Sequence, residues 1–130
     1  MDTVSRIPIR IQFEEIGESE GEFIRFLAPR TVDSILRLLP LQGRVAIWKE
    51  QVYFQVPLKI GLEKGIKKIS KGDIAYWPMG NAICIFLSVM QPQGSVNLIG
   101  KILSGLEELR KIKSGTPIKF EILAKSNLGS

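Results

Sequence analysis

Most of the bulky amphipathic aromatic residues of this chain stand near the ends of two pairs of strand-like segments. They are Trp48, Tyr53, Phe54, Tyr76 and Trp77. Clustered rings of this kind line apolar grooves that hold a small molecule or an extended peptide. Each ring could equally pack in the core or at the end of a barrel, and the sequence leaves both roles open. Because the five are grouped rather than scattered, we expect a ligand-binding groove.

An enzyme using such a groove would need polar side chains beside the rings. The candidates are Arg44, Glu50, Gln55, Asp73 and Asn81, although Asp73 and Asn81 stand where turns are expected. We add Arg44 and Gln55 to the predicted groove and assign no catalytic residue. The chain has no histidine, which removes the commonest general base and the commonest metal ligand. We therefore expect no metal site and no cofactor.

The single cysteine, Cys84, permits no intramolecular disulfide. It lies within residues 82–87, a run of six positions without a polar side chain, so both faces of this strand should be covered. We expect Cys84 to be a small buried hydrophobic residue with a raised pKa and little reactivity. A nucleophilic cysteine is the lesser alternative.

The basic charge is concentrated in the second half of the chain. Residues 1–58 contain 7 Lys and Arg against 8 Asp and Glu, whereas residues 59–130 contain 11 against 5, which together give the net charge of +5. Five of these lysines crowd the segment 59–71: Lys59, Lys64, Lys67, Lys68 and Lys71. Such a cluster can contact phosphates, but it is also typical of an exposed connection. Nucleic acid is therefore not the partner we expect.

The length of 130 residues and the hydrophobic content of 45% predict a single domain over residues 1–130. No apolar run approaches the roughly 20 residues of a membrane-spanning helix. The N-terminal sequence also lacks the pattern of a secretory signal. We expect a cytoplasmic protein without membrane contact, and the sequence does not decide its oligomeric state.

Alternation of apolar and polar residues predicts strands at 7–13 and 22–27, with the acidic stretch 14–21 as the turn between them. Further strands are predicted at 43–48, 52–56, 96–103 and 116–123, with Gly100 marking a bulge. The central hairpin pairs residues 74–77 with 82–87 around the turn Pro78-Met79-Gly80-Asn81. Residues 59–71 are predicted to form a loop or a short irregular strand, and residues 90–95 a loop.

Two helices are predicted. The first begins at Pro29, presents Val32, Ile35, Leu36 and Leu39 on one face, and ends before Pro40. The second is expected to be capped by Ser104 and to end in basic residues before Gly115, with Leu106, Leu109 and Ile112 facing inward.

About eight strands with two widely separated helices exclude a regular α/β alternation. They predict a mainly β protein, a closed antiparallel β-barrel whose ends the helices cover.

Three segments carry a resemblance to a known family. They are residues 48–54 (Trp-Lys-Glu-Gln-Val-Tyr-Phe), residues 72–78 (Gly-Asp-Ile-Ala-Tyr-Trp-Pro) with Gly80, Ala82 and Cys84, and Val96-Asn97 with Ile99-Gly100. In this order they resemble small prokaryotic cyclophilin-like proteins over residues 7 to 124. The resemblance implies a cyclophilin-like barrel with a groove on its outer face.

True cyclophilins bind a prolyl peptide in that groove and use an arginine within a Phe-His-Arg segment. The corresponding segment here is Tyr53-Phe54-Gln55, so glutamine stands in place of the arginine, and no histidine is present. The resemblance therefore implies the fold and the groove without the catalytic group. A binding module is the expected function, with a peptidyl-prolyl isomerase or another enzyme on the same groove as the alternative.

Overall fold

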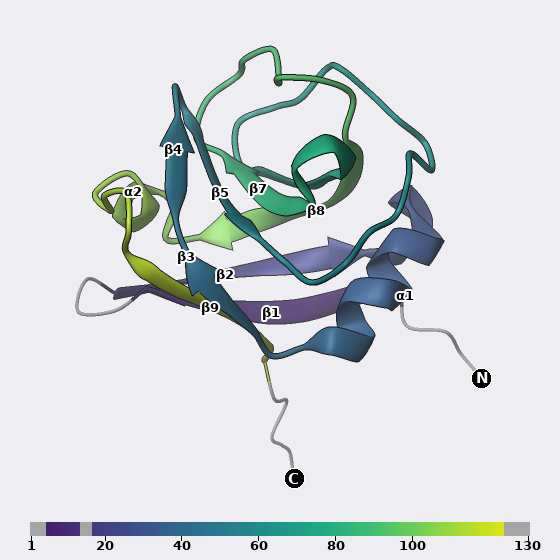
Figure 1. Cartoon of the computed structure of the whole chain (residues 1–130). Helices are drawn as coiled ribbons and strands as arrows, with labels where there is room; N and C mark the ends of the chain where they lie inside the picture. The colour runs from purple at the N-terminus through teal and green to yellow at the C-terminus, as the bar shows by residue number, and fades with distance from the viewer. Residues whose placement is uncertain (1–4, 14–16, 124–130) are drawn as a thin grey trace, which may run out of the picture.

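The computed structural model describes residues 5–13 and 17–123. These residues form nine strands, two α-helices and two short 3-10 helices (Figure 1). In chain order the elements are β1 Arg6–Phe13, β2 Gly17–Ile24, η1 Arg25–Leu27, α1 Pro29–Leu38, β3 Leu41–Arg44, β4 Ala46–Trp48, β5 Gln51–Gln55, β6 Asp73–Trp77, η2 Pro78–Gly80, β7 Ala82–Phe86, β8 Asn97–Ser104, α2 Leu106–Leu109 and β9 Pro117–Ile122.

All nine strands join one antiparallel sheet in the order β3-β9-β1-β2-β8-β6-β7-β5-β4. The two strands at the ends of this order, β3 and β4, are neighbours in the chain, with only Val45 between them. One extended segment therefore links the two edges of the sheet and nearly closes a barrel. The predicted antiparallel barrel is confirmed.

The prediction of one strand over residues 43–48 is wrong, because the chain changes partners at Val45. The Val45 N–H donates to the carbonyl of Thr116 (3.0 Å), and the Val45 carbonyl accepts from Gly115 (2.7 Å). The residues before it pair with β9 and the residues after it pair with β5. Among the described residues no strand pairing joins β3 to β5. We call the unpaired boundary between these two strands the seam.

The core confirms that the strand at residues 82–86 is central. All five residues of β7 are buried, between β5 on one side and β6 on the other. Inside the barrel, the Phe120 ring lies 5.3 Å from that of Phe54 and 6.3 Å from that of Phe23, centroid to centroid. A second buried cluster, Ile69, Ala75, Cys84, Phe86 and Val96, lies on the other face of the sheet. The long connections that contribute Ile69 and Val96 thus cover that face.

The prediction of an acidic turn over residues 14–21 is wrong for the residues that the structure describes. Residues 17–21 belong to β2, which pairs with β1 as far as Phe13 opposite Gly17. Ser19 is buried and its hydroxyl donates to the carbonyl of Gly105 (2.7 Å). Pairing with β1 and burial of Ser19 hold this segment in the sheet, while residues 14–16 lie outside the described residues. Residues 25–27, predicted as strand, form η1.

The first helix is confirmed as α1, with Pro29 in its first turn. The second is much shorter than predicted. Ser104 is the last residue of β8, and the residue before α2 is Gly105, whose φ of 83° favours glycine. Ser104 therefore does not cap the helix, although Leu109 and Ile112 are buried as expected.

No helix among the described residues is long and apolar enough to span a membrane.

The predicted bulge at Gly100 is confirmed. Ile74 pairs with Gly100, but the next residue of β6, Ala75, pairs with Leu98, so β8 carries an extra residue here. A Cβ on Gly100 would lie 2.0 Å from the carbonyl oxygen of Glu22 on β2. Only glycine lets the two strands approach this closely.

Candidate functional site

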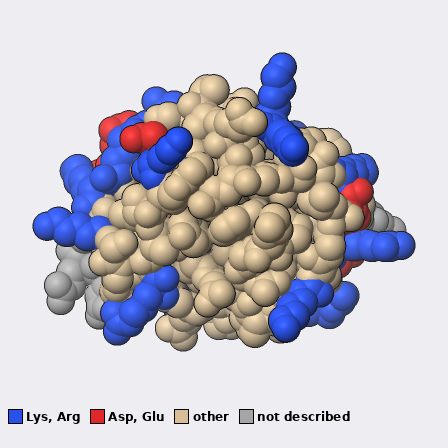
Figure 2. Space-filling model, turned by 45° about the horizontal axis from the view of Figure 1, so that its top comes forward, with Lys and Arg blue, Asp and Glu red and all other residues tan. Residues whose placement is uncertain are grey.

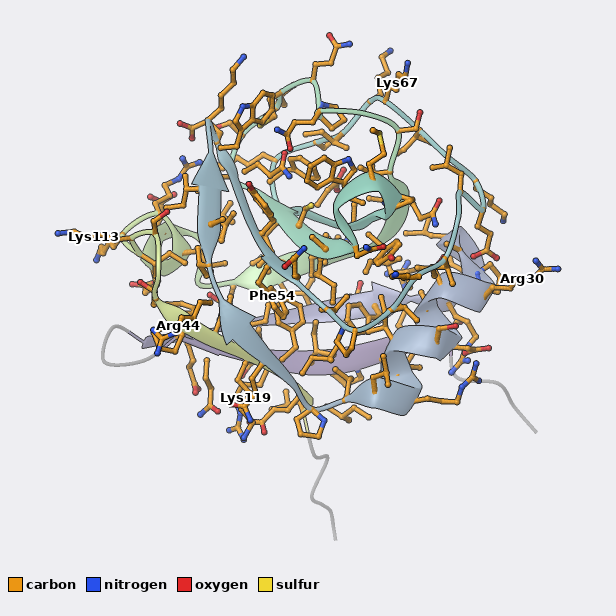
Figure 3. The ribbon with its side chains drawn as sticks, in the orientation of Figure 1. Arg30, Arg44, Phe54, Lys67, Lys113 and Lys119 are labelled. Atoms are coloured by element: carbon orange, nitrogen blue, oxygen red, sulfur yellow. The ribbon has the colours of Figure 1, made fainter. Side chains whose placement is uncertain are left out.

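A pocket of about 460 Å³ lies over the seam, between β5 and the turn that follows β6. It is lined by Arg44, Ala46, Tyr53, Phe54, Gln55, Trp77 and Gly80. Five of these residues belong to the groove predicted from the sequence. Figure 3 shows Phe54 in the middle of this face, with Arg44 toward the left edge of the barrel.

Strand β5 supplies three neighbouring residues to the pocket. Phe54 points into the barrel, where only 2% of its surface is exposed, and its ring packs on Phe120. Tyr53 and Gln55 point to the outer face because side chains alternate along a strand. Tyr53 is half-buried and Gln55 is exposed. The alternation therefore gives the pocket an apolar floor at Phe54 and a polar side chain at its edge.

The turn after β6 fixes the position of Trp77. The rings of Tyr53 and Trp77 meet edge to face, with centroids 5.8 Å apart and planes at 88°. A Cβ on Gly80 would lie 2.4 Å from the Trp77 ring, so only glycine allows the turn to fold against the indole. Asn81 completes the turn with a φ of 48°. The predicted turn is thus confirmed, and it gives the aromatic wall a rigid backing.

Arg44 and Ala46 come from the two sides of the point where β3 ends and β4 begins. The Arg44 guanidinium donates to the carbonyl of Gly115 (2.9 Å) through Nη1, which leaves its other N–H groups available. A Cβ on Gly43 would lie 2.9 Å from the Phe54 ring. Side-chain packing, rather than strand pairing, closes the barrel beneath the pocket.

Two residues of the predicted groove do not line this pocket. Tyr76 is fully buried, and its hydroxyl donates to the carbonyl of Leu58 (2.5 Å) while accepting from the N–H of Ile60 (3.4 Å). It holds the connection after β5 against the barrel. Trp48 ends β4, where the Lys49 ammonium lies 4.8 Å from the centroid of its ring. Trp48 and Tyr76 occupy positions in their strands that resemble those of Tyr53 and Trp77. Sequence patterns therefore could not distinguish the aromatic residues that line the pocket from those that do not.

The other polar candidates lie elsewhere. Glu50 accepts from Arg110 (3.2 Å) and from the hydroxyl of Ser88 (3.2 Å). Asp73 accepts from the backbone N–H of Ser70 (2.7 Å), which is the expected turn contact. The polar groups at the pocket are therefore the guanidinium of Arg44, the carboxamide of Gln55 and the hydroxyl of Tyr53. This set can hydrogen-bond and orient a ligand, and the described lining residues include no carboxylate, histidine or lysine.

Cys84 lies beneath the outer aromatic residues without entering the pocket. It is fully buried, and burial raises the pKa of its thiol to about 12, although the Gln51 amide at 3.2 Å acts in the opposite direction. The expected burial and raised pKa of Cys84 are confirmed, and its low reactivity stays a prediction. Among the described residues, no group of three or more His, Cys, Asp or Glu side chains could hold a metal ion.

Two lining residues, Ala46 and Gly80, were not anticipated from the sequence. Gly80 carries a recognisable signal, since a glycine in the turn directly after an aromatic residue permits close packing on its ring. Ala46 carries no such signal, because its position depends on the change of strand partner at Val45.

A second, smaller pocket of about 350 Å³ lies on the outer side of β1, β9 and β3, lined by Gln12, Gln42, Gly43, Pro117, Ile118 and Lys119. It has no aromatic wall.

Comparison with protein families gives a match to the Cyclophilin-like family model over residues 7–121. The chain belongs to the Cyclophilin-like family. No curated protein matches the chain. Among solved structures, it is similar to the hypothetical protein AF2241 from Archaeoglobus fulgidus, with a TM-score of 0.81 and 29% identity over 94% of this chain and 98% of that one.

The chain is also similar in fold to McbB, a structure solved in complex with tryptophan. The TM-score is 0.71 and the identity is 11%, over 92% of this chain and 47% of the other. This cyclophilin-like protein thus spans about half the length of McbB, and a likeness at this identity concerns the fold alone. The barrel is shared, whereas function must be argued from the pocket.

Proposed function

We propose that this cyclophilin-like protein is a binding module that takes a small molecule or an extended, proline-containing peptide in the pocket over the seam. The observation that carries the proposal is the composition of the pocket walls. Tyr53 and Trp77 supply aromatic surface over the buried Phe54, while Arg44 and Gln55 supply polar groups. Concave apolar sites with a few polar groups are the usual form of ligand pockets.

The pocket walls are held in place by contacts within the protein. Phe54 packs on Phe120, and Trp77 is fixed between Tyr53 and Gly80. Ligand binding therefore requires little ordering of the site, and burial of one large apolar side chain contributes about 1.5 to 3 kcal/mol to the binding free energy.

We also propose that the protein is located in the cytoplasm. A free, buried thiol is compatible with a reducing compartment.

The chemistry of the pocket favours binding without turnover. Catalysis of prolyl isomerisation requires a group that stabilises the twisted amide more than the planar one. In the family resemblance this group is an arginine, and here Gln55 stands in its place. A neutral carboxamide provides weaker electrostatic stabilisation than a guanidinium.

The test is binding of a fluorescein-labelled peptide with a Phe-Ala-Pro-Phe core, measured by fluorescence anisotropy. We expect saturable binding that Tyr53→Ala and Trp77→Ala each weaken by about tenfold or more, because both remove aromatic surface from the pocket. Trp48→Ala is the matched control, since Trp48 is an aromatic residue outside the pocket. Equal loss of affinity in all three variants, or no binding by the wild type, would contradict the proposal.

Peptidyl-prolyl isomerisation is the second candidate function, favoured by one observation. Arg44 lines the same pocket as Gln55 and has guanidinium N–H groups to spare. The Arg44 guanidinium could supply the positive charge that the neutral carboxamide of Gln55 does not provide. A chromogenic Ala-Pro peptide assay separates the two functions: we expect no rate above background, whereas a rate that Arg44→Gln abolishes would make the protein an isomerase.

A further inference from the structure

The face of the barrel that holds the pocket has an uncharged centre bordered by basic side chains. Figure 2 shows Lys and Arg around the edge of this face, few acidic groups, and no charged side chain across the middle. Figure 3 labels five basic residues: Arg44, which lines the pocket, and Lys113, Lys119, Lys67 and Arg30, which lie toward the outer edges of the molecule in this view. We call these five residues the basic rim. They come from β3, the connection before β9, β9 itself, the connection after β5, and α1.

The positive charge of the basic rim is only partly neutralised within the protein. Lys119 shares Glu121 with Arg10 (3.5 Å and 2.9 Å), and Arg30 lies near the carboxylate of Glu63. Among the described residues, however, Arg44, Lys67 and Lys113 form no ion pair with an acidic side chain. Within the part of the chain that the structure describes, no carboxylate lines the pocket. An approaching ligand therefore meets a positive field around an apolar centre.

We infer that the occupant of the pocket is an extended peptide segment with an apolar core flanked by acidic residues. The inference rests on the proposed binding function and specifies its ligand. The apolar side chain of such a segment would contact Tyr53 and Trp77, while its carboxylates would face Arg44 and the rest of the basic rim. Complementary charge of this kind speeds association and discriminates between partners of different charge.

The pocket geometry favours a peptide over a nucleic acid, which would also satisfy the charge. Nucleic acids gain binding energy by stacking bases on open aromatic faces. Here Gly80 lies against the Trp77 ring and the Tyr53 ring meets it edge to face. Phe54 is almost entirely buried. The rings thus form the walls of a pocket suited to a side chain, rather than a platform for successive bases.

Three labelled peptides test the inference with the full chain. They share the Phe-Ala-Pro-Phe core and differ in flanking pairs of Asp, Asn or Lys. At about 50 mM NaCl we expect the Asp peptide to bind about tenfold tighter than the Asn peptide, and the Lys peptide to bind most weakly. At about 300 mM NaCl the difference should shrink several-fold, because salt screens exposed charges.

Charge variants locate the effect. Lys67 and Lys113 belong to the basic rim but do not line the pocket. The double substitution Lys67→Gln with Lys113→Gln should lower the preference for the Asp peptide about threefold or more and leave binding of the Asn peptide unchanged. The control Arg37→Gln with Lys101→Gln removes the same charge outside the basic rim. It should retain the preference.

Each contrary outcome has a distinct meaning. Equal affinity for the Asp and Asn peptides at both salt concentrations overturns the acidic ligand and leaves the proposed binding function standing. Failure of all three peptides to bind contradicts both. If a single-stranded thymidine oligonucleotide binds more tightly than the Asp peptide at about 300 mM NaCl, the basic rim serves a nucleic acid instead.

Discussion

At the scale of single residues, the clearest assignments concern side chains whose environment follows from the strand pattern. Cys84 belongs to an uninterrupted apolar run, and such a run has both faces covered. The groove aromatics were harder to assign. Tyr53 and Tyr76 both stand in aromatic-rich strands, yet one lines the pocket and the other is buried with its hydroxyl bonded to Leu58. The difference depends on the connection after β5, which no local pattern reveals.

The environment of Cys84 predicts a thiol that is unreactive in the folded protein. Its pKa of about 12 leaves roughly one thiolate in ten thousand at about pH 8, and the sulfur is fully buried. We expect no reaction with the aromatic disulfide DTNB in buffer and stoichiometric reaction in about 6 M guanidinium chloride. Stoichiometric labelling of the folded protein within minutes would contradict the burial of this residue.

At the scale of elements, the strands and α1 were predictable because their apolar residues recur with the period of a strand or a helix. The errors fall where a tertiary contact overrides the local pattern. Residues 17–21 look like a turn by composition, but pairing with β1 holds them in β2. The segment 43–48 looks like one strand, but the contacts of Val45 with Gly115 and Thr116 divide it.

The bulge in β8 makes a prediction about two glycines. Gly100→Ala should destabilise the protein by about 3 kcal/mol, because a Cβ would overlap the Glu22 carbonyl and force β2 and β8 apart. Gly61→Ala is the control, since a Cβ there would meet no atom within 4 Å. It should change the free energy of unfolding by less than about 1 kcal/mol. Urea titration measures both, and equal effects would refute this account of the bulge.

Glu63, in the connection after β5, serves as the N-terminal cap of α1. Its carboxylate accepts from the backbone N–H groups of Arg30 and Thr31 and from the Thr31 hydroxyl, all at 2.9 Å. The backbone N–H of Glu63 in turn donates to the buried amide of Asn97 (2.8 Å). These contacts fasten a long connection to a helix that is distant in sequence.

This cap predicts a specific pH dependence. Partial burial acts to raise the pKa of Glu63, but the hydrogen bonds from Arg30 and Thr31 outweigh it, so the pKa lies below the usual glutamate value. The cap therefore stabilises the folded state above the unfolded pKa, and this contribution is lost as the pH falls through the folded pKa.

The substitution Glu63→Gln isolates this contribution. It should cost about 1 kcal/mol at neutral pH, and the difference from wild type should shrink as the pH is lowered from about 5 to about 3. Chemical denaturation of both proteins across that range measures it. A difference that stays constant with pH would mean that the charge of Glu63 does not contribute.

At the scale of the whole molecule, the sequence predicted the barrel and most of the pocket residues but not how the pocket is built. The pocket exists because β3 and β4 pair with different strands and leave the seam between β3 and β5. That arrangement depends on contacts between residues 45 and 115–116, which are far apart in the chain. The basic rim likewise gathers residues from five separate parts of the sequence.

The central claim, that the pocket over the seam binds an apolar ligand, is tested most directly by nuclear magnetic resonance. The chain has two tryptophans, Trp48 and Trp77, and so gives two indole N–H signals. Trp77 lines the pocket and Trp48 does not. Titration with the Asp-flanked Phe-Ala-Pro-Phe peptide should shift the Trp77 indole and the backbone signals of Tyr53 and Gln55, and leave the Trp48 indole in place. A shift of the Trp48 indole alone, or no shift at saturating peptide, would contradict the claim.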